Sequence, residues 1–231
     1  MLRLGLQKTS LVDYPGRVAT VLFTVGCNFR CPYCQNSGLV APDPVADGLH
    51  SVDDVLAFLD GRRGLVSAVV ISGGEPTLHP ELPDLAASVR AMGFLVKVDT
   101  NGSYPEMLGR IGADYFAMDL KTDPERYDRL WPSAPADASA RLRESVALIR
   151  SSGTLYEFRI TCAPGIFDED SARAVAELLK PGDPVFLQRC RLGTVLDPEW
   201  ARGVSPYTDA RLEGLLSIVR QAAPLARIRG G

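Results

Sequence analysis

Three cysteines stand close together in the segment VGCNFRCPYCQN. Cys27, Cys31 and Cys34 follow the pattern C-x-x-x-C-x-x-C. A structural zinc site needs four ligands, usually as two separated pairs, but the chain has two histidines and no second Cys or His pair. Three thiolates instead suit a [4Fe–4S] cube in which three irons take protein ligands and the fourth stays open. An open iron can chelate a small molecule through an amine and a carboxylate, so this loop predicts a ligand-binding cluster.

The two remaining cysteines, Cys162 and Cys190, stand alone in apolar, strand-like surroundings. Small buried side chains are the ordinary role of cysteine in such positions, so we expect neither to bind the cluster. Five cysteines is also an odd number, and the cytosol keeps thiols reduced, so no disulfide framework is expected.

The composition of the 231-residue chain is that of an ordinary globular protein, with 46% hydrophobic and 23% charged residues. A formal net charge of -3 gives no strong signal for nucleic-acid or membrane binding. The start MLRLGLQKTS has no apolar signal-peptide core, and the longest apolar stretch is too short to span a bilayer. We therefore expect a cytoplasmic protein.

No repeat, low-complexity segment or long linker divides the chain. We expect one domain over 1–231, with its core at about 15–190, a C-terminal helix at about 207–222 and a frayed tail, RIRGG.

Short runs rich in Val, Ile, Leu and Phe alternate with segments of helical periodicity. Ser51, with Asp54 three residues later, predicts a helix start. Pro80 in a first turn and Asp168 or Asp170 ahead of SARAVAELL do the same. The predicted strands are 19–25, 67–73, 94–100, 115–121, 155–161 and 184–189. The predicted helices are 51–61, 80–92, 104–111, 138–152, 169–180 and 207–222.

Six strand-then-helix units with nearly uninterrupted apolar strands predict a parallel sheet covered by helices. Two α/β architectures meet this description. One is an open, doubly wound sheet, and the other is a barrel that is fully or partly closed.

Unusual polar residues collect at the C-terminal ends of the predicted strands. The cysteine loop follows the first strand, and GGEP, residues 73–76, follows the second. Asp99 and Asn101 close the third strand, and Asp119 and Lys121 close the fourth. Both α/β architectures build their active sites at this face, so these residues predict one site there.

CNFRCPYC after the first strand, together with ISGGEPTL after the second, resembles the radical S-adenosylmethionine (SAM) superfamily over about residues 15–190. The resemblance implies a partial (β/α)6 barrel of the TIM type, a [4Fe–4S] cluster on Cys27, Cys31 and Cys34, and SAM as a second cofactor. In that superfamily the free iron binds the amino and carboxylate groups of SAM. One electron then breaks the sulfonium S–C5′ bond, and the 5′-deoxyadenosyl radical takes a hydrogen atom from the substrate.

The GGEP turn fits the amino group of SAM. Gly73 and Gly74 let backbone carbonyls approach a cationic group closely, and Glu75 adds a compensating carboxylate. Tyr33, inside the cysteine loop, is expected to lay its ring or backbone beside a bound ligand.

Three further groups have both a SAM-binding and a structural interpretation. Asp99 and Asn101 offer partners for ribose hydroxyls, although a helix cap with a left-handed turn at TNGS explains them equally well. Asp119 and Lys121 share one strand face; they resemble the D-x-K element by which glycyl-radical-enzyme activases contact SAM, or they pair with each other. Arg159 either reaches solvent or, as we favour, directs its guanidinium at the SAM carboxylate.

The chain is short for this superfamily and has no second cysteine cluster, which predicts a barrel open along one side. SLVDYPGRVATVLFTVGCNFRCPYCQN is similar to the opening of activating proteins for anaerobic ribonucleoside-triphosphate reductase. The resemblance therefore implies an activase that forms a glycyl radical on this partner, with a flavodoxin- or ferredoxin-type protein as electron donor. Such activases often carry histidine directly after the third cysteine, where this chain has Gln35, so the identity of the partner stays open.

Two other functions remain compatible with these residues. The nearer one is a radical SAM enzyme acting on a small molecule or a tRNA base, although the weak basic content argues against a large nucleic acid. The more distant one is a non-catalytic iron–sulfur or zinc module. Iron and sulfide analysis separates the zinc case, because zinc binds without sulfide.

Overall fold

The computed structural model describes residues 2–40 and 48–230. Within these residues the chain forms a nine-stranded sheet in the order β3-β1-β2-β4-β5-β6-β7-β8-β9. The neighbours from β2 to β9 are parallel, whereas β1 pairs antiparallel with both β2 and β3. The strands are β1 (Arg3–Tyr14), β2 (Arg17–Thr24), β3 (His50–Ser51), β4 (Ala68–Gly73), β5 (Leu95–Thr100), β6 (Tyr115–Asp119), β7 (Leu155–Cys162), β8 (Val185–Arg189) and β9 (Arg227–Arg229).

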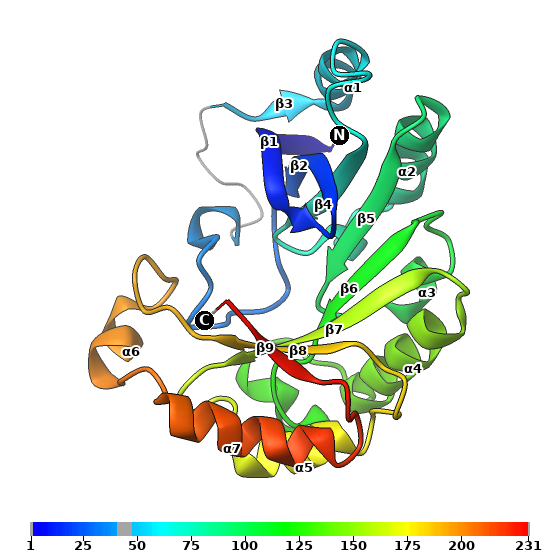
Figure 1. Cartoon of the computed structure of the whole chain (residues 1–231). Helices are drawn as coiled ribbons and strands as arrows, with labels where there is room; N and C mark the ends of the chain where they lie inside the picture. The colour runs from blue at the N-terminus through cyan, green and yellow to red at the C-terminus, as the bar shows by residue number, and fades with distance from the viewer. Residues whose placement is uncertain (1, 41–47, 231) are drawn as a thin grey trace.

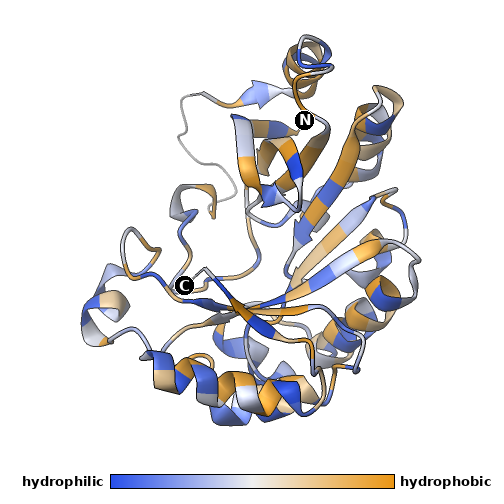
Figure 2. Ribbon diagram, viewed as in Figure 1, coloured by the Kyte–Doolittle hydropathy of each residue, from blue (hydrophilic) through white to orange (hydrophobic). Residues whose placement is uncertain are grey.

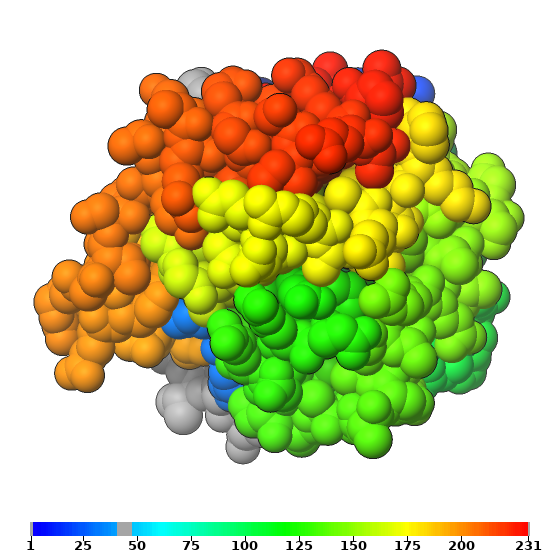
Figure 3. All heavy atoms as spheres, turned by 90° about the horizontal axis from the view of Figure 1, so that it is seen from below, coloured from blue at the N-terminus to red at the C-terminus, as the bar shows by residue number. Residues whose placement is uncertain are grey.

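Helices connect the parallel strands and cover the outer face of the curved sheet (Figure 1). From below, α4, α5 and α7 form a continuous cover in green, yellow and orange-red (Figure 3). The helices are α1 (Val52–Asp60), α2 (Leu82–Ala91), α3 (Pro105–Leu108), α4 (Ala138–Ser151), α5 (Glu169–Ala176), α6 (Pro198–Gly203) and α7 (Asp209–Arg220), and the 3-10 turns are η1 (Ser37–Leu39), η2 (Pro76–Leu78) and η3 (Pro124–Arg129). None of the helices in the described ranges combines the length and apolar character that crossing a bilayer requires.

The sheet is a partly closed barrel. Its order begins at β3 and ends at β9, and these two edges do not pair with each other in the described part of the chain. The six predicted strands are confirmed as β2, β4, β5, β6, β7 and β8. The predicted α/β partial barrel is therefore confirmed, and the open doubly wound sheet is excluded by the closing curvature in Figure 1.

Both ends of the sheet differ from the prediction. The tail that was expected to be frayed instead forms β9, which pairs with β8. The two arginines of this strand make its sequence look like an exposed tail. Arg229 can lie in a strand because it pairs with Glu157, 72 residues earlier in the chain. At the other end, β1 begins at Arg3, well before the expected start of the core at about residue 15.

The helix starts depend on local capping. The Ser51 hydroxyl accepts a hydrogen bond from the backbone N–H of Asp54, and the Asp54 carboxylate accepts one from the N–H of Ser51, which confirms the expected capping pair. Asp168 likewise caps α5. The expectation for Pro80 is wrong, because α2 begins at Leu82, beyond that proline. The helix expected over 104–111 is reduced to the short α3.

Two hydrophobic clusters fill the molecule. The larger one lies between the sheet and the helices, and the hydropathy colouring shows the strands as largely apolar (Figure 2). The smaller one lies on the opposite faces of the strands and includes Tyr14 and Tyr115, whose rings meet edge to face with centroids 5.7 Å apart. This second cluster fills the barrel near the N-terminal ends of the strands. The polar residues inside the barrel lie at the C-terminal ends of the strands.

Candidate functional site

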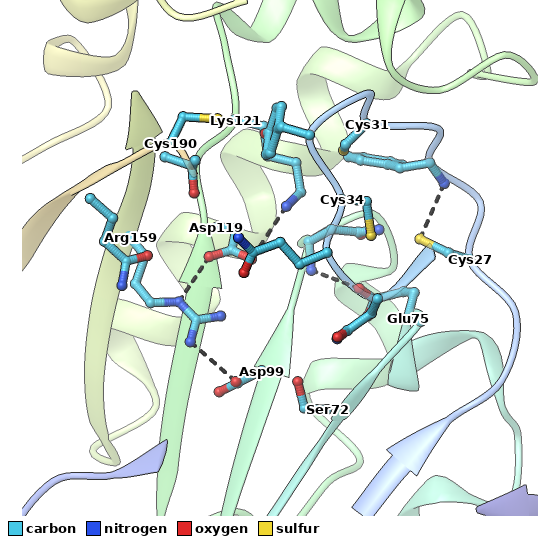
Figure 4. A pocket seen from close by; sticks show the side chains of 18 of the residues that line it. Cys27, Cys31, Cys34, Ser72, Glu75, Asp99, Asp119, Lys121, Arg159 and Cys190 are labelled. Atoms are coloured by element: carbon cyan, nitrogen blue, oxygen red, sulfur yellow. Dashed lines mark hydrogen bonds and ion pairs between the residues drawn. The ribbon is translucent and has the colours of Figure 1, made fainter. Parts of the chain in front are cut away.

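A cavity of about 440 Å³ lies at the C-terminal ends of the parallel strands. Side chains from several strand ends and from the cysteine loop point into it (Figure 4). Every residue that the sequence predicts for the site lines this cavity: Cys27, Cys31, Tyr33, Cys34, Gly73, Gly74, Glu75, Asp99, Asn101, Asp119, Lys121 and Arg159.

The cysteine loop is anchored by Phe29, which lies two residues after the first cysteine. Phe29 is 1% exposed, and its ring lies 5.6 Å from the Tyr127 ring and 5.4 Å from the Trp131 ring, centroid to centroid. The adjacent Arg30 N–H donates to the carbonyl of Leu130 over 2.6 Å. The segment from Tyr127 to Trp131 therefore acts as a fixed wall that holds the loop against the barrel.

A second segment holds the far end of the loop. The N–H of Leu196 donates to the carbonyl of Cys34 over 2.9 Å, and the N–H of Asp197 donates to the carbonyl of Pro32 over 3.0 Å. Within the loop the Cys34 N–H donates to the Cys31 carbonyl over 3.0 Å, which closes a turn between the last two cysteines. The loop is thus preorganised by main-chain hydrogen bonds before any metal binds.

The surroundings of two loop thiols, those of Cys27 and Cys31, disfavour ionisation and raise the pKa of each. Burial, with a smaller contribution from the carboxylate of Glu75, raises the pKa of Cys27 to about 12. Burial also raises the pKa of Cys31, while the ammonium of Lys121 opposes both shifts. These thiols therefore stay protonated near neutral pH unless a metal supplies positive charge, as cluster iron does.

The three thiols of the loop fit a [4Fe–4S] cube, because all of them line one cavity. Among residues 2–40 and 48–230, no three His, Cys, Asp or Glu side chains gather to hold one metal ion. In a [4Fe–4S] cube each of the three thiolates binds a different iron. Three cysteines spread over one cavity wall are therefore suited to the cube.

Cys162 and Cys190 are both buried, at 0% and 3% exposure. Burial raises the pKa of Cys162 to about 12 and that of Cys190 to about 11. Cys190 also lines the cavity. Its position in the cavity could not be predicted, because Cys190 stands alone in the sequence.

The two glycines of the GGEP turn bring β4 against the start of the cysteine loop. Gly73 has φ +118, and a Cβ there would lie 2.4 Å from the backbone nitrogen and oxygen of Thr24. A Cβ on Gly74 would lie 2.0 Å from the carbonyl oxygen of Gly26. The Glu75 N–H donates to that same carbonyl over 2.8 Å. Only glycine permits this approach.

Glu75 joins the GGEP turn to the end of β5. It is 1% exposed, and its Oε1 accepts hydrogen bonds from the hydroxyls of Thr77 (2.5 Å) and Thr100 (2.7 Å). Its Oε2 accepts from the N–H of Asn101 over 2.7 Å. Burial raises the pKa of Glu75 despite these donors. Its contact with the amino group of SAM stays a prediction.

The side chain of Asn101 forms the hydrogen bonds of a polar turn next to the cysteine loop. Its Oδ1 accepts from the N–H and the hydroxyl of Ser103, at 3.0 and 2.6 Å, and its Nδ2 donates to Oδ1 of Asn28 over 2.9 Å. Gly102 follows with φ +76. The left-handed turn expected at TNGS is therefore present at Gly102, whereas the expected helix cap is wrong, because the N-cap of α3 is Tyr104, without a side-chain hydrogen bond. The ribose contact stays a prediction.

A chain of ion pairs crosses the barrel beneath the cavity. Asp99 pairs with Lys97 Nζ at 2.5 Å and with Arg159 Nη1 at 3.1 Å. Asp119 pairs with Arg159 Nε at 2.8 Å and with Lys121 Nζ at 3.3 Å. Arg159 therefore points inward rather than to solvent (Figure 4). Asp99, Asp119, Lys121 and Arg159 line the cavity, so this chain of ion pairs presents two cations and two carboxylates to it.

The pH dependence of stability tests this chain of ion pairs. Burial opposes the charge of Asp119, but Arg159 and Lys121 lower its pKa from 3.8 to about 2. Such a group stabilises the fold above its unfolded pKa, and that contribution is lost as pH falls through the folded pKa.

We expect Asp119→Asn, in the cluster-free protein, to lower the free energy of unfolding by about 2 kcal/mol near neutral pH. The difference from wild type should narrow as the pH falls from about 4 to about 2, where the wild-type carboxyl becomes neutral. Urea unfolding at a series of pH values measures this. A difference that does not change with pH would contradict the ion-pair account.

Comparison with known proteins identifies the family. The model of the radical SAM superfamily matches residues 21–178. The chain belongs to the radical SAM superfamily. Members of this superfamily use a [4Fe–4S] cluster and SAM, and Cys27, Cys31 and Cys34 lie in the region where the family binds its cluster. This radical SAM chain is therefore an enzyme.

Two proteins of Methanocaldococcus jannaschii, each named "Putative glycyl-radical enzyme activating enzyme", are similar in sequence. One is 28% identical over 205 residues, which cover 86% of this chain and 83% of the relative. The other is 28% identical over 169 residues, which cover 70% of this chain and 63% of the relative. The structure of QueE from Escherichia coli matches all of this chain and 92% of its own, with a TM-score of 0.53 and 19% identity, and so shares its fold.

Several lining residues of this radical SAM enzyme were not predicted. Ser72, Thr161 and Gln188 line the cavity from strand ends that the sequence had already placed at this face. Arg229 and Gly230 line it from β9, and only the fold brings them there. Gln35, the departure from the activase pattern, is exposed at the cavity wall.

Proposed function

We propose that this radical SAM enzyme is a glycyl-radical-enzyme activase whose partner is anaerobic ribonucleoside-triphosphate reductase. The observation that carries the proposal is the partly open barrel. The cavity is lined on one side by the cysteine loop after β2 and on the other by residues of β8 and β9, the strands next to the opening. An extended segment of another protein can therefore reach the cavity through this side.

The relatives support the activase over other radical SAM functions. Both Methanocaldococcus jannaschii proteins carry the activase name, and one of them matches most of this chain. The choice of the ribonucleotide reductase as partner rests on the LVDYPG segment, which forms the end of β1 and the turn that leads into β2. A flavodoxin- or ferredoxin-type protein is the proposed electron donor.

Each wall of the cavity has a proposed task. When bound, the cluster and SAM supply the 5′-deoxyadenosyl radical that removes a Cα hydrogen from a glycine of the partner. Cys27, Cys31 and Cys34 hold the cluster. The GGEP turn would bind the amino group of SAM, and Arg159 and Lys121 would bind its carboxylate.

Electron paramagnetic resonance tests the proposal. The reduced, reconstituted enzyme is incubated anaerobically with SAM and with candidate glycyl-radical enzymes, including anaerobic ribonucleotide reductases. We expect a glycine-centred doublet on the reductase, and none when the acceptor glycine of the reductase is replaced by alanine. SAM cleavage without a radical on any candidate would refute the activase function, and cleavage stimulated by a small molecule or a tRNA would support another radical SAM reaction.

A further inference from the structure

The last described strand runs into the candidate site. β9 pairs in parallel with β8, with Arg229 opposite Gln188, and Gly230 follows directly with φ +78. Arg229 and Gly230 line the same cavity as the cysteine loop. In Figure 1 the red strand β9 ends beside the blue loop that follows β2. An extended main chain followed by glycine therefore already lies at the open side of the barrel.

One side chain fastens this strand inside the barrel. The guanidinium of Arg229 donates to both carboxylate oxygens of Glu157, at 2.8 and 2.6 Å. Glu157 is 1% exposed, and the Tyr115 hydroxyl donates to it over 3.1 Å. The same guanidinium lies 3.6 Å from the centroid of the Phe186 ring. This bidentate, stacked pair is the strongest kind of single-residue attachment that the strand has.

The rest of the strand is attached by its pairing with β8 and by Ile228, which packs partly buried against the larger hydrophobic cluster. β9 has three residues, and Arg227 and Gly230 are exposed. If Arg229 withdrew, Glu157 would keep the hydrogen bond from the Tyr115 hydroxyl. Among the described residues Arg229 is the ion-pair partner of Glu157, so breaking this pair is the main cost of removing the strand.

We propose that Arg227–Gly230 occupies the place that the glycine segment of the partner protein takes during activation, and that the partner displaces it. The inference rests on the proposed function, since an activase must receive its substrate as an extended main chain with a glycine at the cavity. Once β9 leaves, the edge of β8 offers its main-chain hydrogen bonds to the incoming segment, as in other cases of strand addition. The pair between Arg229 and Glu157 then sets how readily the site opens.

Two substitutions on the same strand test the proposal. Arg229→Gln removes the charge that pairs with Glu157, whereas Arg227→Gln removes an equal charge that stacks 4.7 Å from the Phe186 centroid. With the reconstituted enzyme, SAM and a partner reductase, titration calorimetry should show roughly ten-fold tighter partner binding for Arg229→Gln. Arg227→Gln should change the affinity by less than about two-fold. Glu157→Gln breaks the same pair from inside the barrel and should shift the affinity in the same direction as Arg229→Gln.

Hydrogen exchange of the wild-type protein provides a measurement that needs no substitution. Adding the partner should increase exchange in residues 225–230 while the cysteine loop becomes more protected. Unchanged or weaker partner binding by Arg229→Gln, or greater protection of residues 225–230 in the complex, would overturn the displacement. Those results, with a glycyl radical still formed by the wild type, leave the activase function intact. Absence of both partner binding and radical in the wild type would instead remove the function on which the inference rests.

Discussion

Replacing Cys27, Cys31 or Cys34 with alanine is expected to abolish the iron–sulfur cluster and, with it, reductive cleavage of SAM. All three thiols line one cavity wall, and a cube that loses one of three protein ligands has two irons without thiolates. Iron and sulfide content after anaerobic reconstitution and the release of 5′-deoxyadenosine measure the two effects. Activity should fall by several orders of magnitude, because no other group supplies the electron to SAM.

The chain contains matched controls for these variants. Cys162→Ala and Cys190→Ala remove buried thiols that lie outside the cysteine loop, so both variants should keep the cluster. Full SAM cleavage by any variant of the three loop cysteines would contradict the three-ligand cluster. Loss of the cluster in either control would mean that the ligand set extends beyond the loop.

Gly74→Ala is expected to be nearly as damaging, although it touches no cysteine. The added methyl group would stand 2.0 Å from the carbonyl oxygen of Gly26 and 2.6 Å from its carbon, both backbone atoms. Because Gly26 precedes the first cysteine, the loop must move to relieve the clash. We expect the cluster content to fall by roughly ten-fold or more, since misplaced ligands lose metal affinity on that scale.

Gly38→Ala is the control for this prediction. Gly38 lies in η1, close to the cysteine loop in sequence, and a Cβ there would meet nothing within 4 Å. The variant should reconstitute like the wild type. A Gly74→Ala protein with full iron, sulfide and SAM cleavage would show that the close contact between GGEP and Gly26 is not needed for the site.

The parallel strands could be predicted because their signals are local. Residues 68–71 of β4 are buried almost completely, and a run of apolar residues of strand length marks such a strand without reference to the rest of the chain. The location of the site could be predicted in the same way, because parallel strands present their C-terminal ends at one edge of the sheet. The cysteine pattern then named the chemistry.

The parts that escaped prediction depend on contacts distant in sequence. Glu75 accepts from Thr100, 25 residues away, and Asn101 donates to Asn28, 73 residues away. Nothing near GGEP indicates that its carboxylate will be enclosed by β5. The strand β9 is the clearest case, because half-buried Arg229 pairs with a buried glutamate that only the folded barrel brings near it.

The loop over residues 131–140 shows the same limit. Its Pro, Ala and Ser residues predict a long surface loop, yet Trp131 at its start is 4% exposed and packs on Phe29 of the cysteine loop. A lone tryptophan among such residues carries no local sign of its partner. The expectation of a surface loop is therefore wrong at this end, where the loop forms part of the wall that holds the cluster ligands.

Transfer of deuterium from the partner to SAM-derived 5′-deoxyadenosine tests the central claim most directly. The partner reductase is produced with glycine deuterated at Cα and incubated anaerobically with the reduced, reconstituted enzyme and SAM. The account predicts 5′-deoxyadenosine that carries one deuterium by mass spectrometry, in step with the appearance of the glycine radical. If SAM is consumed in the presence of the partner and the 5′-deoxyadenosine carries no deuterium, the hydrogen does not come from a glycine of that protein and the account is contradicted.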